Sequence, residues 1–336
     1  MTLRSDDLQV THLAGETTHG TPVTANKQLP NTKILIMPAG APNEEYMADG
    51  HLIPSSNTNN LEWSDGKWDA PPTFDESFFM LDSIYGIATP VPGPLTIAQT
   101  RTYPIAIQTP IVYRSYSVER GITGAVNKYA NVVFNTHHFV ISKRDKPMMD
   151  GNVFGQLVTP AVAFTAPSPT VLKSSPISNM QFDLYSATTY ALLSTAPTLI
   201  STAFRLDYTY GPAFGEAAFI GSASPTWDSL GSIVPATKVL LTLPFDVAGT
   251  DFVGLLNLSA KRNGTPVYLR LKATGVTLET GIVQTFIVDL VLRARNVPNM
   301  NQIDKAKFVG LQWECGLFID EVAQAAGQFQ TICETA

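Results

Sequence analysis

The chain has 336 residues, of which 44% are hydrophobic and 15% are charged, and its formal net charge is −6. The length suggests two domains, and the acidic balance argues against tight, sequence-independent DNA binding, which needs Lys and Arg to displace counterions. No run approaches about 18 uninterrupted apolar residues, so no membrane-spanning helix is expected.

Glycine and proline together number 23 + 24 = 47, which favours short strands joined by many turns. The N-terminus has no apolar core and does not resemble a secretory signal. Cys315 and Cys333 lie near the C-terminus without metal-ligand spacing. We therefore expect no metal site, no disulfide and no bound cofactor.

The first third of the chain contains expected strands at 33–37 and 61–63 and one expected helix at 73–86. Thr73 and Glu76 have the spacing of a capping box, and Gly86 is placed to end the helix. Its apolar face consists of residues at helical spacing, namely Phe74, Phe78, Leu81 and Tyr85.

Adjacent histidines, His137 and His138, stand in the apolar run YANVVFNTHHFVIS at 129–142. Successive side chains of a strand point to opposite faces, so the two imidazoles cannot bind one ion without a bulge. A chelating pair would need spacing i,i+2 on a strand or i,i+4 on a helix. The pair is interpreted as two polar residues on a strand that meets other protein on both faces.

The second half is again dominated by period-two alternation. Helices are expected at 249–264 and, weakened by Gly327, at 320–334. Asp289 interrupts an otherwise apolar strand. The expected strands of this half lie at 180–185, 204–210, 238–243, 267–273, 286–292 and 308–319.

The order of elements repeats along the chain. The same order of strand, turn, strand, helix and long strand begins at Lys33 and again at Ala203. The two copies are offset by 211 − 40 = 171 residues between their turn glycines and by 252 − 78 = 174 residues between their helix phenylalanines. We predict two tandem β domains, at 1–165 and 177–336, joined by a Pro/Ser-rich linker at 166–176.

Catalytic motifs are missing: there is no Gly-rich phosphate loop, GxSxG elbow or HExxH in the sequence, and the chain is not expected to be an enzyme. Trp63 and Trp68 flank the turn-like SDGK. Aromatic residues there are compatible with a sugar site or with burial between subunits.

Taken in order, the elements resemble the tail tube protein, or major tail protein, of long-tailed siphophages. The resemblance rests on YRSYSVERGITGAVNKYANVVFNTHHFVISK (113–143), on GTPVTANKQLPNTKILIM (20–37) and on the EYMADGHLIPSSNTNNLEWSDGKW loop (45–68) with the helix after it. It extends over nearly the whole chain, although the pattern is diffuse and contains no catalytic motif.

This resemblance implies a mainly β fold of two tandem tube domains, each a β-sandwich with a flanking helix and long inter-subunit loops. Three such subunits would form a ring with pseudo-sixfold symmetry, and stacked rings would form the tail tube of the virion, assembled in the host cytoplasm. Expected partners are further copies of the chain, tape-measure, tail-terminator and tail-tip proteins, and genomic DNA that transits without tight binding. No membrane partner is expected.

Residue-level expectations follow from the same interpretation. Trp63, Trp68, His137 and His138 are candidate subunit-interface residues. Glu119 and Asp289 are candidate acids of the lumen, where carboxylates would repel the DNA backbone. The N-terminal arm 1–22 and the loop 41–70 are expected to order across joints between subunits. The alternatives are another viral β-sandwich, such as a capsid or decoration protein, and a carbohydrate-binding or hydrolytic β-sandwich.

Overall fold

The structure is a computed structural model. It describes residues 9–45, 56–105, 110–142, 145–156, 158–173, 175–201, 203, 205–219, 226–244, 266–295, 299–303 and 308–334. The described chain is mainly β, as predicted, and 21 of its strands are connected by backbone pairing. None of the described helices is long and apolar enough to cross a membrane.

The strands divide at the middle of the chain. The N-terminal strands are β1 Val10–Gly15, β2 Lys27–Gln28, β3 Lys33–Glu45, β4 Ser56–Ala70, β5 Val91–Pro92, β6 Ala98–Pro104, β7 Tyr116–Ile122, β8 Ala125–Phe134, β9 His137–Ser142, β10 Met148–Gly155, β11 Val158–Ala161 and β12 Thr170–Val171. The C-terminal strands are β13 Phe182–Ala187, β14 Thr198–Leu199, β15 Arg205–Tyr210, β16 Phe214–Ala217, β17 Ser229–Ser232, β18 Thr237–Pro244, β19 Val267–Glu279, β20 Ile282–Ala294, β21 Asn299–Ile303, β22 Phe308–Leu317 and β23 Gly327–Glu334. The helices are α1 Ser77–Ile84 and α2 Leu192–Thr195, with a 3₁₀ turn at Asn179–Gln181.

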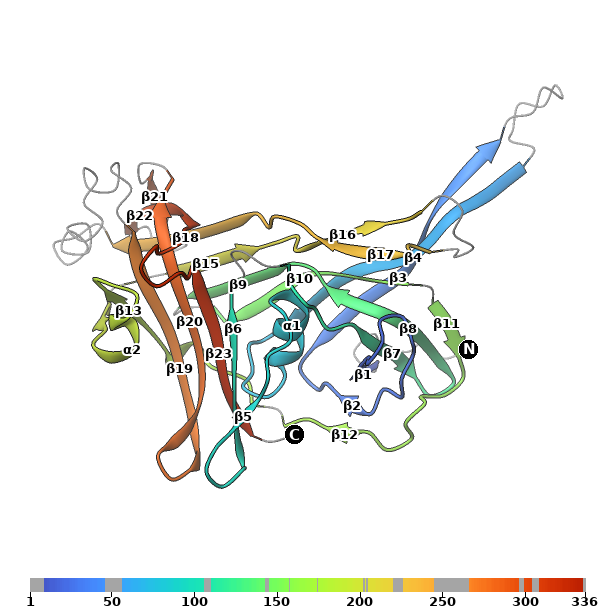
Figure 1. The fold of residues 1–336 in the computed structure, drawn as a ribbon, viewed down its shortest axis with the longest axis horizontal. Coiled ribbons are helices and arrows are strands. Elements are labelled where there is room, and N and C mark those ends of the chain that lie inside the picture. Colours follow the sequence, from blue (N-terminus) through green and yellow to red (C-terminus); the bar gives the residue numbers. More distant parts are fainter. Residues whose placement is uncertain are drawn as a thin grey trace.

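Eight of these strands follow one another without a break across the molecule, all antiparallel, in the order β3-β4-β10-β9-β15-β18-β22-β21. We call this the long sheet. It extends from the β3–β4 hairpin at the upper right of Figure 1 to β21 and β22 at the upper left. The pairing of β9 with β15 joins the N-terminal to the C-terminal part of the chain.

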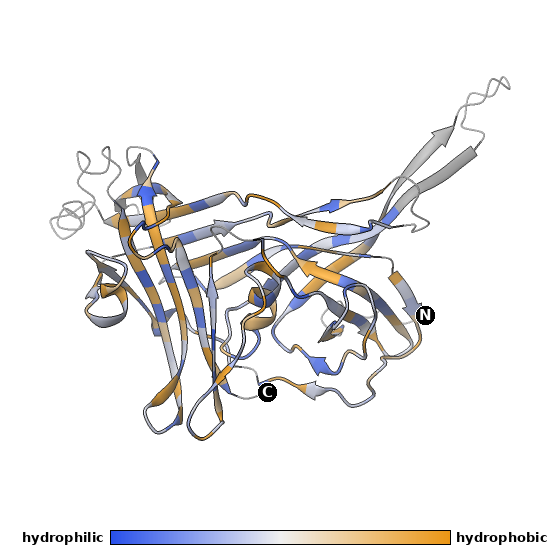
Figure 2. Cartoon of the chain, in the orientation of Figure 1, coloured by the Kyte–Doolittle hydropathy of each residue, from blue (hydrophilic) through white to orange (hydrophobic). Residues whose placement is uncertain are grey.

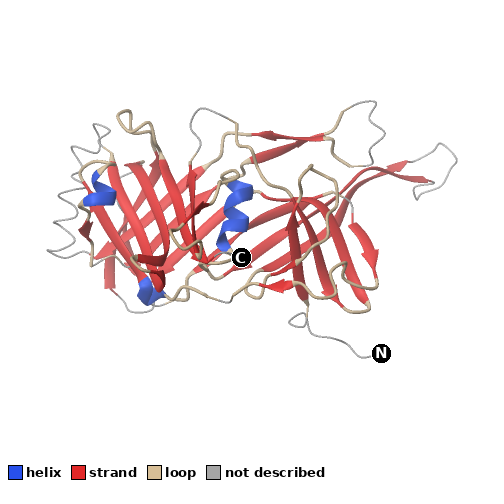
Figure 3. Ribbon diagram, turned by 60° about the horizontal axis from the view of Figure 1, so that its bottom comes forward, coloured by secondary structure: helices blue, strands red, loops and turns tan. Residues whose placement is uncertain are grey.

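Two further groups of strands cover one face of the long sheet. The first has the order β2-β1-β7-β8-β11, and the second has the order β14-β13-β19-β20-β23-β6-β5. Figure 3 shows them on either side of α1. Because β6 pairs with β23, the second group also contains strands from both parts of the chain.

The core lies between the long sheet and its covering groups. Apolar and polar residues alternate along the strands, as the colours of Figure 2 show, so each strand directs one row of side chains inward. Aromatic pairs connect the layers: Trp68 of β4 meets Phe134 of β8, with ring centroids 5.7 Å apart, and Tyr208 of β15 meets Phe329 of β23 at 5.6 Å.

The two parts of the chain have the same pairing order. In the N-terminal part the order is β3-β4-β10-β8-β7-β1, and in the C-terminal part it is β15-β18-β22-β20-β19-β13. The hairpins β9–β10 and β21–β22 also occupy matching places. The linker region packs on the N-terminal part, because β12 pairs in parallel with β2.

Helix α1 is shorter than the predicted 73–86, so Phe74 lies before it and Tyr85 is its C-cap. The four residues predicted to be apolar contacts, Phe74, Phe78, Leu81 and Tyr85, are all buried, but nearly all other residues of α1 are buried as well. Gly86 follows the cap with φ of +102°, as expected of a helix-ending glycine. The capping box is only half formed. The Glu76 amide donates to Thr73 Oγ1 at 2.9 Å, but the Glu76 carboxylate accepts instead from Asn31 and Thr32.

Two other expectations are wrong. Residues 327–334 form strand β23 and not a helix, because alternate residues Phe329, Thr331 and Cys333 are buried and Gly327 has φ of +153°. The segment 41–70 is not a loop where it is described, since 41–45 and 56–70 belong to the paired strands β3 and β4. The helix predicted at 249–264 lies outside the described residues.

The N-terminal arm is also more ordered than expected. Its residues 10–15 form β1, and Leu13 is fully buried. The Glu16 carboxylate accepts hydrogen bonds from Gly20 N and Asn131 N, both at 2.9 Å. These contacts fix residues 10–20 on the N-terminal covering group. Residues 1–8 lie outside the described part.

Candidate assembly interface

The joint between the two parts of the chain is the antiparallel pairing of β9 with β15. Its register runs from His137 opposite Tyr210 to Ser142 opposite Arg205. Strand β9 supplies His137, Phe139 and Ile141 to the buried face, while its other side chains point to the open face of the long sheet. The two histidines therefore lie on opposite faces of one strand, as predicted.

His137 belongs to the core. Its side chain is fully buried, and its Nδ1 lies 2.9 Å from the Tyr85 hydroxyl. The rings of Trp68 and Phe139 stack beside it. Burial lowers the pKa of His137 to about 3, so the imidazole is neutral at neutral pH.

His138 lies on the open face, between two carboxylates from neighbouring strands. Its Nδ1 is 2.7 Å from Asp150 Oδ1 on β10, and its Nε2 is 3.0 Å from Asp207 Oδ1 on β15. Arg205 donates to the second oxygen of Asp207 at 3.0 Å. The hydrogen bond that Asp207 accepts from His138 raises the pKa of the imidazole above its usual value. Protonated His138 can donate to both acids and connects the two parts of the chain.

Only β3 and β21 end the long sheet. Among the described pairings, β3 pairs with β4 alone and β21 with β22 alone. The first four residues of β3, from Lys33 to Ile36, lie opposite Asp69 to Gly66 on their paired side. A strand edge of this kind is a template for pairing with another chain.

The open face of the long sheet is rich in charge. Asp150, Asp207 and Lys67 share it with Lys238 and Glu314, which form an ion pair at 3.4 Å. Because side chains alternate along each strand, the other charged residues on this face are Lys33, Asp65, Asp69 and Arg205. The described face thus carries five acids and four bases, with His138 in addition.

Both candidate lumen acids are buried, so that assignment is wrong. A carboxylate must be exposed on the subunit to line a lumen, but Glu119 is 3% and Asp289 is 1% exposed. Asp289 forms a bidentate pair with Arg270 at 2.7 and 2.8 Å. Glu119 lies 3.5 Å from Lys128 Nζ and accepts from Thr165 N. Cross-strand partners made it possible to bury these acids, and the strand pattern alone did not reveal them.

The four candidate interface residues fall into two groups by their burial. Trp68 and His137 are fully buried within the subunit, so neither can contact another subunit directly. Trp63 is half-buried and shares the open face with Asp65, and His138 is half-buried at the joint between the parts of the chain. Sequence reasoning missed Asp150 and Asp207, whose meeting at His138 depends on the distant β9–β15 pairing.

No cluster of three or more His, Cys, Asp or Glu residues suited to a metal ion occurs among the described residues. Both cysteines are free and buried. Neither the family models nor the curated proteins compared with the chain give a match.

Proposed function

We propose that the chain is a structural subunit that assembles into the stacked rings of a phage tail tube. The observation that carries this proposal is the position of the sheet edges. Strand β9 pairs with β15 inside the chain, and the strands at matching places in the pairing order, β21 and β3, are the two ends of the long sheet. A second copy can therefore repeat outside the chain the joint already made within it.

The matching pairing orders support two tandem copies of one sandwich-like tube domain, the boundaries predicted being 1–165 and 177–336. A contact from β21 of one subunit to β3 of the next is heterologous, and such a contact forms a ring when the rotation that it repeats closes; closure with three subunits is part of the proposal. Three subunits contribute 3 × 8 = 24 strands to one barrel. With strands about 4.8 Å apart and tilted by about 40°, such a barrel has a backbone diameter of about 48 Å.

The covering groups and α1 occupy one face of the long sheet. On the other face, Trp227, just before β17, packs against Phe154 of β10 with ring centroids 5.9 Å apart, and the rest of this open face is proposed to line the inside of the barrel. The lumen acids in this proposal are Asp65, Asp69, Asp150, Asp207 and Glu314, in place of Glu119 and Asp289. Their charge is nearly balanced by nearby bases on the same face. Such a mixed surface offers no continuous cationic track for phosphate binding, which suits DNA that must pass without adhering.

The β3–β4 hairpin, which extends from the body in Figure 1, is proposed to reach the neighbouring ring. Tape-measure and tail-end proteins are the proposed further partners, and the virion tail is the proposed location. These assignments rest on the family resemblance.

Negative-stain microscopy of the purified full chain, combined with light scattering over a range of concentrations, tests the proposal. We expect threefold rings or hollow tubes whose mass rises with concentration. Closed shells would identify another kind of viral β protein. A compact monomer at the highest concentration would overturn the assembly proposal, and measurable sugar affinity of that monomer would favour the carbohydrate-binding alternative.

A further inference from the structure

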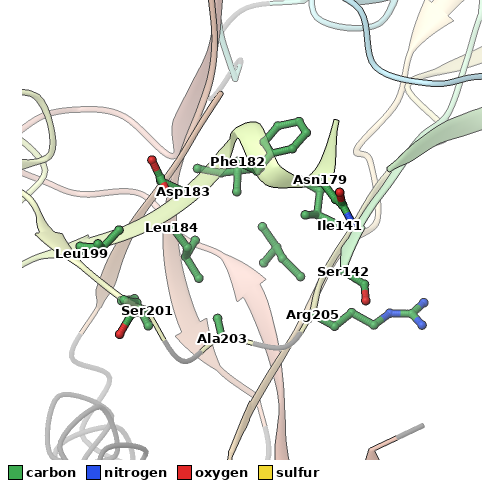
Figure 4. Close-up of a pocket in the computed structure, with 13 residues that line it drawn as sticks. Ile141, Ser142, Asn179, Phe182, Asp183, Leu184, Leu199, Ser201, Ala203 and Arg205 are labelled. Atoms are coloured by element: carbon green, nitrogen blue, oxygen red, sulfur yellow. The ribbon is translucent and has the colours of Figure 1, made fainter. Parts of the chain in front are cut away.

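Two pockets of the molecule have corresponding walls. The inner pocket, of about 200 Å³, lies at the joint between the two parts of the chain and is shown in Figure 4. The outer pocket, of about 500 Å³, lies beside the beginning of β3 at one end of the long sheet.

Their walls come from strands at matching places in the two pairing orders. The inner pocket uses the pair Leu184 and Leu271 from β13 and β19. The outer pocket uses the pair Thr11 and Arg120 from β1 and β7. The strand that follows each pocket begins with a basic residue that lines it, Arg205 of β15 inside and Lys33 of β3 outside.

One wall differs. The inner pocket is bounded by Ile141 and Ser142 at the end of β9, the strand that pairs with β15. The described lining of the outer pocket contains no residue from a strand paired with β3. The outer pocket is also the larger and more polar of the two, as expected of a site that lacks one wall in the described part of the chain.

We infer that the end of β21 from a second copy of the chain supplies the missing wall of the outer pocket, as the end of β9 supplies it in the inner pocket. The inference rests on the proposed ring assembly and specifies its contact. The proposed occupant of the outer pocket is thus β21, the strand whose place in the pairing order matches that of β9.

The register of this contact follows from two pairs of facing residues. Met149 of β10 lies opposite both Ala70 and Phe139, and Leu311 of β22 lies opposite both Leu243 and Met300. Phe139 and Met300 therefore hold matching positions.

The same comparison aligns β3 with β15. Counting back four residues from the matched pair Ala70 and Leu243 gives Gly66 and Val239, which lie opposite Ile36 and Tyr208. Ile36 and Tyr208 thus hold matching positions. Because Phe139 lies opposite Tyr208 inside the chain, Met300 of one copy lies opposite Ile36 of the next, and Ile303 lies opposite Lys33.

A cysteine cross-link in the full chain tests this register. The variant Lys33→Cys/Ile303→Cys places two thiols opposite each other across the contact, within the Cα separation of about 7 Å that a disulfide tolerates. The matched control, Lys33→Cys/Asn299→Cys, displaces one thiol by four residues, or about 13 Å along the strand. We expect most of the matched variant to become covalent oligomers on mild oxidation, at least tenfold more than the control.

Hydrogen exchange on the unmodified protein gives a second measurement that needs no variant. Amides of residues 33–37 should gain protection on assembly. Particles that assemble without the matched cross-link and without this protection overturn the pocket assignment but leave the proposed function standing. A wild-type chain that never assembles overturns both.

Discussion

The N-terminal and C-terminal parts of the chain place an ion pair at the same position of their pairing orders, with the signs exchanged. Glu119 of β7 lies opposite Lys128 of β8, and Arg270 of β19 lies opposite Asp289 of β20. The N-terminal pair is a single contact of 3.5 Å with a partly exposed lysine. The C-terminal pair is bidentate and almost fully buried.

A second exchange concerns volume. Trp68 of β4 lies opposite Gly151 of β10, whereas Leu241 of β18 lies opposite Trp313 of β22. A Cβ on Gly151 would come within 1.9 Å of the Thr136 carbonyl oxygen and within 2.7 Å of Trp68 Nε1, so both the neighbouring backbone and the tryptophan require glycine at this position. Each pair keeps one large aromatic residue in the core but takes it from the opposite strand. The two parts can therefore share a pairing order although their amino-acid sequences differ, because core packing constrains the combined side-chain volume of a facing pair more than the size of either residue.

Trp68→Ala is expected to give the largest effect on this comparison, a loss of about 3–5 kcal/mol in the free energy of unfolding, because it opens a cavity in the core. Trp63→Ala is the matched control, since Trp63 is only half-buried. Urea unfolding of both variants measures the difference. Equal losses would contradict the separate placement of the two tryptophans.

Arg270→Ala should cost about 3 kcal/mol, because among the described residues it leaves the buried Asp289 carboxylate with the side-chain amide of Gln328 at 3.0 Å as its remaining hydrogen-bond donor. The double variant Arg270→Asp/Asp289→Arg reproduces the sign order of the N-terminal pair and should recover part of that loss. Denaturant midpoints of the single and double variants give the coupling. A double variant no more stable than the single would show that only the existing orientation fits.

The two histidines are expected to act at opposite ends of the pH range. The unfolded His137 takes a proton near pH 6.5 but the folded one only near 3, so its contribution to stability is lost as pH falls from 6.5 to 3. The folded pKa of His138 is raised above 6.5, so its contribution is complete below 6.5 and is lost as pH rises through the folded value.

His137→Phe should therefore flatten the acid side of the stability profile, and His138→Gln should flatten the side above pH 6.5. Urea midpoints measured from about pH 4 to pH 9 separate the two effects. An unchanged acid limb in the first variant would contradict the neutral, buried state of His137.

Lys128→Ala is expected to have the smallest effect, about 0.2–1 kcal/mol, because its ammonium is partly exposed and solvent screens the pair with Glu119. Salt titration of the wild type and the variant checks this value. A loss as large as that of Arg270→Ala would show that the two ion pairs are equally desolvated.

Much of the local structure could be predicted from the sequence. Alternation identified the strands, including β19 and β20, and helical spacing identified α1 with its stop at Gly86. These features depend on neighbours in sequence. The helix predicted at 320–334 was wrong because the prediction used neighbours in sequence alone. Helix-favouring residues precede Gly327, but the pairing of β23 with the distant strands β20 and β6 decides the conformation of 327–334.

The candidate site was less predictable. His138 meets Asp207 from 69 residues away, and Asp289 is neutralised by an arginine on another strand, so neither contact has a local signature. Asp289 was conspicuous in sequence because it interrupts an apolar run, and that same setting is what buries it. Glu119 has no such run around it, and the partly exposed acids of the long sheet lie in ordinary alternating strands.

The β9–β15 joint affects how the proposed rings would assemble and dissociate. Because both strands belong to one polypeptide, they meet at an effective concentration fixed by the connecting chain, independent of how much protein is present. In the proposed ring of three subunits, three of the six joints are the internal β9–β15 pairings, one in each free molecule. Dilution can open only the three joints between subunits, so disassembly should release subunits whose β9–β15 pairing is intact.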